Sequence, residues 1–160
     1  MKWQTSLLQQ IFLLAATLFP VSEFCYGQMM AGTAKVDITD YKAGPVHDPM
    51  FVKALVLQQG KTQVVVVTVD AVAIGGIGRL KNGYLAKVRS AVHQDIGIPP
   101  SNVLVNASHC HGIVRGDTDE LTIEAIKSAA ENLVPVRVGV GVGHEEFGNL
   151  LRRCHRLPLL

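Results

Sequence analysis

Two histidines separated by a single residue, His109 and His111, give this sequence its clearest chemical potential. They follow the segment 102–107, which we expect to form a core strand. Side chains two positions apart on an extended segment point to the same side, so the two imidazoles would lie next to each other. Neutral imidazole is a common zinc ligand. The pair therefore predicts a metal or catalytic site, with two polar loop residues as the alternative.

Asp70 is the second candidate, because it follows the apolar run 63–69 in the same way. Ligands of open α/β sheets gather at the carboxyl ends of the strands, so we expect Asp70 at the same edge as the histidines. It would act either as a direct metal ligand or as a hydrogen-bond acceptor that orients a histidine. Cys110 would point away from both histidines, as a small buried residue.

Other polar residues are weaker candidates. His47 lies in the turn-rich loop 41–49 and is more typical of a turn than of a ligand. His144 follows the last expected strand and is more typical of a solvated loop. Gly75, Gly76 and Gly78 do not have the spacing of a dinucleotide-binding fingerprint.

Hydrophobic periodicity predicts the elements that must position these residues. Apolar residues at helical spacing favour two helices, and alternating or continuous apolar runs favour strands. After an N-terminal hairpin the order is β-α-β-α-β, which predicts an α/β fold with a largely parallel or mixed β-sheet and flanking helices. The expected strands are 31–38, 51–57, 63–69, 102–107 and 135–142, and the expected helices are 82–96 and 118–133.

Three local features refine this prediction. The run 64–67 has no polar side, which is typical of a central strand covered on both faces. Gly97 is expected to end the first helix. Asp117, with Glu120 three residues later, is expected to cap the second helix.

The composition excludes several classes of protein. With 48% hydrophobic residues and a net charge of +2 among 160 residues, the chain is not intrinsically disordered. Its basic residues form no stripe, which argues against nucleic acid as a partner. Three cysteines are too few for a disulfide-rich scaffold, although Cys110 and Cys154 would be free to pair after export.

The first 27 residues are predicted to be a signal peptide. Lys2 supplies the positive charge, residues 11–19 form an almost unbroken apolar run, and Gly27 closes a cleavage site. This run is too short for a stable membrane span, which needs about 20 residues. Residues 28–160 would then be exported as the mature protein. An uncleaved N-terminal anchor is the alternative.

Three segments together resemble neutral/alkaline non-lysosomal ceramidases and their bacterial relatives. Residues 31–39 (AGTAKVDIT) resemble the opening strand of that family, and residues 48–57 (DPMFVKALVL) resemble its next strand. Residues 97–111 (GIPPSNVLVNASHCH) resemble the segment that leads to its Thr-His-Thr-His motif. The family's Ser-Gly-Pro after the second histidine is replaced here by Gly112-Ile113-Val114.

The resemblance implies a zinc-dependent amide hydrolase. It carries over a zinc ligand to His109 and an active-site histidine to His111. The family's other ligands come from later in a longer chain. It follows that residues 28–160 would be the N-terminal part of the catalytic domain, inactive alone, with a lipid amide or another small amide as the substrate.

Two other interpretations stay open at this point. In the first, the chain is a non-catalytic exported remnant or binding module and not that enzyme fragment. An amidohydrolase barrel built on His-x-His ranks last, because it needs more β-α units than the sequence contains.

Overall fold

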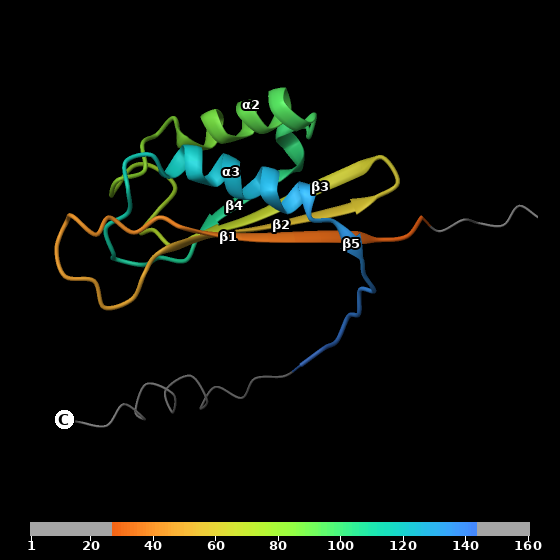
Figure 1. Cartoon of the computed structure of the whole chain (residues 1–160), viewed down its shortest axis with the longest axis horizontal. Coiled ribbons are helices and arrows are strands. Elements are labelled where there is room, and N and C mark those ends of the chain that lie inside the picture. The colour runs from red at the N-terminus through yellow and green to blue at the C-terminus, as the bar shows by residue number, and fades with distance from the viewer. Residues whose placement is uncertain (1–26, 144–160) are drawn as a thin grey trace, which may run out of the picture.

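The computed structural model describes residues 27–143, so the expected signal peptide, His144 and Cys154 lie outside the described residues. A β-sheet and two helices make up this part of the chain (Figure 1). The strands are β1 (Met30–Asp37), β2 (Phe51–Gln59), β3 (Thr62–Val69), β4 (Val103–Ala107) and β5 (Val134–Pro135). The helices are α2 (Tyr84–Ile96) and α3 (Thr118–Glu131), with a 3-10 turn, η1 (Pro100–Asn102), before β4.

The sheet is mixed, and its strand order is β4-β3-β2-β1-β5. Strands β1, β2 and β3 form an antiparallel meander, in which the loop 38–50 joins β1 to β2 and a tight turn at Gly60 and Lys61 joins β2 to β3. Helix α2 crosses over to β4, which pairs with β3 in parallel. The α/β prediction is therefore confirmed. The sheet is not largely parallel, since β3 and β4 form the one parallel pair among the described strands.

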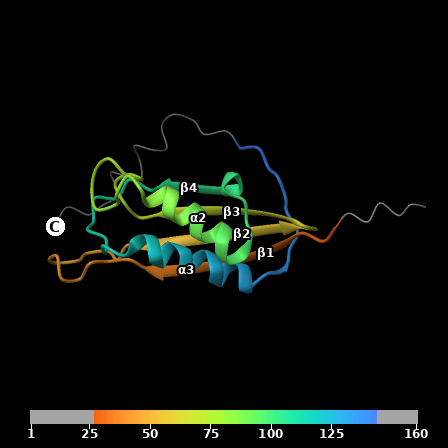
Figure 2. The same ribbon diagram turned by 90° about the horizontal axis from the view of Figure 1, so that it is seen from above.

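The core lies between one face of the sheet and the two helices (Figures 1 and 2). Val67 from the sheet, Val88 from α2 and Ile126 from α3 are fully buried there. The buried hydroxyl of Tyr84 meets the hydroxyl of Thr122 at 2.7 Å and joins the two helices. Burial raises the pKa of Tyr84 to about 12.

No described helix covers the opposite face of the sheet (Figure 1), and apolar side chains on this face are exposed. Val64 is 38% exposed and Leu104 is 58% exposed. The expectation that the run 64–67 is covered on both faces is therefore wrong for residues 27–143. Both helices pack on the same face of the sheet. Helix α2 lies in the connection from β3 to β4, and α3 lies in the connection from β4 to β5.

The predicted end of α2 is confirmed, whereas the predicted cap of α3 is wrong. Gly97 adopts a φ of 74° and ends α2 as expected. Asp117 makes no side-chain cap at the start of α3, because its carboxylate pairs with Arg115. The hydroxyl of Thr118, the first residue of α3, donates to the backbone carbonyl of Arg115 at 2.6 Å.

The last predicted strand, 135–142, is wrong. Strand β5 covers Val134–Pro135 and pairs antiparallel with β1 at the far edge of the sheet. Beyond it, Val138 and Val140 are 66% and 95% exposed, so their alternation has no sheet face to fill. In the described range, no helix is both long and apolar enough to cross a membrane.

Candidate functional site

The candidate site forms where the parallel strands β3 and β4 end, at the left of Figure 1. The chain after β4 continues to follow the chain after β3. The backbone N–H of Ser108 donates to the carbonyl of Val69 at 3.0 Å, and that of Cys110 donates to Ala71 at 3.2 Å. The two segments that carry Asp70 and the histidines therefore lie side by side, as the sequence predicted.

The rings of His109 and His111 lie close together. Their centroids are 5.1 Å apart, and the ring planes meet at 83°. The reason differs from the one expected, because His109 has a left-handed φ of 61° and the segment is not extended. Both side chains are exposed. The proximity of the imidazoles thus depends on a local twist of the loop.

A backbone carbonyl orients the ring of His109. Its Nδ1 lies 3.0 Å from the carbonyl oxygen of Val72. A carbonyl only accepts hydrogen bonds, so the proton must be on Nδ1. In the neutral ring this tautomer leaves Nε2 with a free lone pair, which is the state of a histidine that binds a metal.

Asp70 lies beneath this loop and is 8% exposed. Its Oδ1 accepts a hydrogen bond from the Ser108 hydroxyl at 2.9 Å. Its Oδ2 accepts from the backbone N–H of Phe51 at 3.1 Å and from Lys53 at 3.2 Å. Burial by itself would raise the pKa of Asp70, but these hydrogen bonds outweigh it and lower the pKa.

These contacts differ from the expected role of Asp70 in orienting a histidine, whereas its role as a direct metal ligand stays a prediction. The hydrogen bonds of its carboxylate go to Ser108, Phe51 and Lys53, and the carbonyl that orients His109 belongs to Val72. Cys110 is half-buried, as a small core-like residue would be, but its Sγ lies 3.2 Å from the Ser108 hydroxyl. Ser108 is the residue that sequence reasoning missed; a serine directly before the His-x-His was its only local signal.

The two imidazoles fit part of a zinc site. Histidine nitrogens suit zinc, and His109 has the appropriate tautomer. A catalytic zinc usually needs three protein ligands. Within residues 27–143, however, no group of three or more His, Cys, Asp or Glu side chains could hold a metal ion. Any further ligands would therefore come from outside the described residues.

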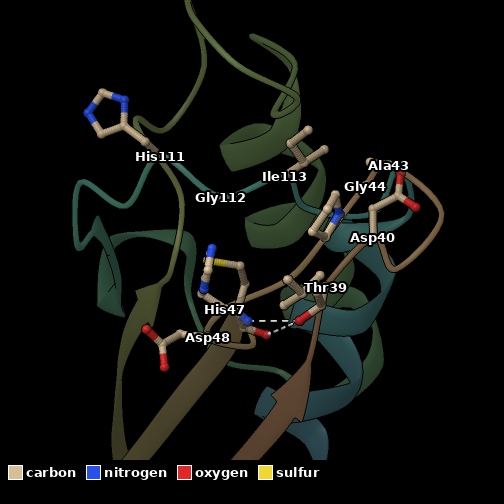
Figure 3. Close-up of a pocket in the computed structure, with 12 residues that line it drawn as sticks. Thr39, Asp40, Ala43, Gly44, His47, Asp48, His111, Gly112 and Ile113 are labelled. Atoms are coloured by element: carbon tan, nitrogen blue, oxygen red, sulfur yellow. Dashed lines mark hydrogen bonds between the residues drawn. The ribbon is translucent and has the colours of Figure 1, made fainter. Parts of the chain in front are cut away.

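Two hollows flank the segment from His111 to Ile113. One has a volume of about 380 Å³ and lies between that segment and the loop that carries Thr39, Asp40 and His47 (Figure 3). Figure 3 shows the ring of His111 projecting from its rim. The other, of about 390 Å³, lies against Val72 and Leu80. His47, interpreted as a turn residue, thus shares a hollow with His111.

Comparisons with known proteins connect this geometry to a fold. Neither a protein-family model nor a curated protein matches the chain. Among solved structures, neutral ceramidase from Pseudomonas aeruginosa matches with a TM-score of 0.55 at 18% sequence identity. A second structure, "Ceramidase complexed with C2", matches with a TM-score of 0.54 at 18% identity.

The fold is ceramidase-like. The matched region covers 68% of this chain and 22% of each ceramidase chain, so the chain spans about a fifth of their length. The resemblance inferred from the sequence is thereby confirmed for the fold. The ceramidase-like fold has an open mixed sheet in its described part, unlike the closed parallel sheet of an amidohydrolase barrel.

Proposed function

We propose that this chain is the N-terminal part of an exported, zinc-dependent amide hydrolase related to neutral ceramidases. His109 would bind the zinc through Nε2, and His111 would line the active site. The observation that carries the proposal is the pair of imidazoles 5.1 Å apart at the strand ends of a ceramidase-like fold. The tautomer of His109, set by Val72, supports the same assignment.

Each histidine would have its own role in hydrolysis. Bound zinc would polarise the amide carbonyl and activate a water molecule. His109 would hold the ion, and its Nδ1–H bond to Val72 would keep the ring from rotating. His111 is exposed next to it and would accept or donate a proton at a ring nitrogen during the reaction.

The surroundings of the histidines support the proposed substrate class. Hollows on both sides of the segment from His111 to Ile113 would take the two arms of a linear amide, either a lipid amide or a smaller one. We expect the chain to be inactive alone, because two imidazoles are fewer than the three ligands that catalytic zinc usually needs. Asp70 would contribute as a buried support rather than as a third ligand.

Zinc titration of the purified protein tests this proposal. We expect His109→Ala to weaken zinc binding by at least about tenfold, since loss of a ligand should cost no less than loss of a supporting residue. His93→Ala removes an exposed histidine from helix α2 and should leave the affinity unchanged. Equal zinc binding by wild type and His109→Ala would refute the metal assignment.

A non-catalytic exported binding module is the second candidate. It is favoured by the absence, within residues 27–143, of a group of three or more His, Cys, Asp or Glu side chains that could hold a metal ion. The DNA that follows the codon for Leu160 distinguishes the two. A frame that continues with another histidine motif indicates an enzyme, and an unrelated sequence indicates a free-standing module. Robust amidase activity of the isolated chain would contradict our expectation that it is inactive alone.

A further inference from the structure

The loop that carries the histidines holds a conformation that its sequence disfavours. His109 is the one non-glycine residue in the described range with a positive φ, at 61°. A side chain with a Cβ rarely adopts this conformation, and surrounding contacts must maintain it.

Backbone contacts fix the two residues on either side of His109. Ser108 N–H donates to Val69 and Cys110 N–H donates to Ala71, at 3.0 and 3.2 Å. These bonds continue the β3–β4 pairing past the ends of the strands. They are made by any residue type, however, so they do not explain why polar side chains occupy positions 70 and 108.

The side chains add a directional chain of hydrogen bonds. The Asp70 carboxylate only accepts, so the Ser108 hydroxyl must donate its single proton to Oδ1 at 2.9 Å. The Cys110 thiol, 3.2 Å from that hydroxyl, must then be the donor to Ser108. The chain therefore runs from Cys110 through Ser108 to Asp70 and links both neighbours of His109 to one buried carboxylate.

Lys53 and the backbone of Phe51 keep this carboxylate charged and fixed. Lys53 Nζ lies 3.2 Å from Oδ2, and the Phe51 N–H donates to the same atom at 3.1 Å. A buried carboxylate is stable when such partners satisfy it. Asp70 is thus anchored to strand β2 on one side and free to hold the Ser108 loop on the other.

We propose that Asp70 and Ser108 act as positioning residues that hold His109 in its left-handed conformation. In that conformation Nδ1 reaches Val72, and Nε2 is available next to His111. The consequence for zinc rests on the function proposed above, whereas the consequence for the tautomer of His109 does not. Asp70 would thus serve the site through Ser108, without contacting the metal.

Nuclear magnetic resonance of the metal-free protein tests the positioning role directly. Long-range ¹⁵N–¹H spectra report which nitrogen of His109 carries the proton. We expect one Nδ1–H tautomer in the wild type and a mixture of tautomers in Ser108→Ala. Ser108→Thr keeps the hydroxyl and should restore the single tautomer. Ser101→Ala, the same substitution at an exposed serine of η1, should change nothing.

Zinc titration of the same variants gives a second readout. Ser108→Ala should bind zinc about tenfold more weakly than Ser108→Thr, which is the size of effect typical of residues that support a ligand. An unchanged tautomer in folded Ser108→Ala overturns the positioning role. If no variant, including the wild type, binds zinc, the proposed function fails, and the tautomer still decides the role of Asp70 and Ser108.

Discussion

At the scale of single residues, the backbone strain of the candidate site is concentrated at His109. Its φ of 61° brings its ring to Val72 and next to His111. The left-handed conformation costs a residue with a Cβ about 1–2 kcal/mol. Strain of this kind lowers the free energy of unfolding, and this effect can be measured without knowing the ligand.

Glycine at position 109 should reveal this strain. We expect His109→Gly to be more stable than His109→Ala by about 1 kcal/mol, because glycine adopts positive φ freely. Urea unfolding of the two variants measures the difference. The control pair is His111→Gly and His111→Ala; His111 lacks a positive φ, so alanine should be at least as stable there. Equal stabilities of the two position-109 variants would show that the loop relaxes at no cost.

Asp70 should make stability depend on acid. Its folded pKa is lowered below the ordinary value of 3.8, so its contribution to stability is complete above that pH. The contribution is lost as the pH falls below 3.8 through the folded pKa, because the carboxylate must then be protonated. Asp37, whose pKa Thr39 lowers by hydrogen bonding, acts in the same direction.

The variant Asp70→Asn isolates this contribution. Urea midpoints measured at pH 6 and pH 3 should differ less in Asp70→Asn than in the wild type, because the amide does not titrate. Some acid sensitivity should remain through Asp37. An identical pH dependence in both proteins would mean that the Asp70 carboxylate is not better stabilised in the folded state.

At the scale of elements, the close approach of β1 to α3 depends on Gly32. A Cβ at this position would overlap the backbone carbonyl of Ala129, which cannot move aside as a flexible side chain would. Gly32 is buried in the middle of β1, against the helix that leads to β5. The glycine therefore sets the distance between the sheet and the helix.

Substitution of Gly32 should destabilise the whole domain. We expect Gly32→Ala to lower the free energy of unfolding by about 1–3 kcal/mol, the usual cost of overpacking, or by more if the helix cannot shift. Gly139→Ala, where an added Cβ meets nothing within 4 Å, is the matched control and should be close to neutral. Thermal unfolding monitored by circular dichroism compares them. A neutral Gly32→Ala would mean that α3 is free to shift away from β1.

The elements also show which structural information is local. The turn before β3 and the left-handed Gly97 depend on neighbouring residues, so the sequence predicts them well. The site edge was also predictable, because Asp70 and His109 both follow strand-like segments. The partner of β5 was not, since it depends on where α3 returns across the sheet. The link from Asp70 to Ser108 was missed for the same reason: it spans 38 positions.

At the scale of the whole molecule, the two faces of the sheet differ. One face is covered by α2 and α3, and the other exposes apolar side chains in the described part of the chain, Leu104 among them. The matched region makes up 22% of each ceramidase chain with a similar fold, so most of each ceramidase lies outside that region. The loops that follow β1, β3 and β4 lie at the same end of the sheet, at the left of Figure 1, and the histidines belong to the loop after β4.

The position of β4 has a consequence for the dynamics of the site. Among the described strands it is one of the two edge strands and pairs with β3 alone, while β3 pairs on both sides. Edge elements open locally without unfolding the domain. We therefore expect the amide protons of Ser108 and Cys110 to exchange with deuterium before that of Val67, as mass spectrometry or nuclear magnetic resonance would record. A partner that binds along β4 would then slow this exchange and keep the rings of His109 and His111 close together for longer.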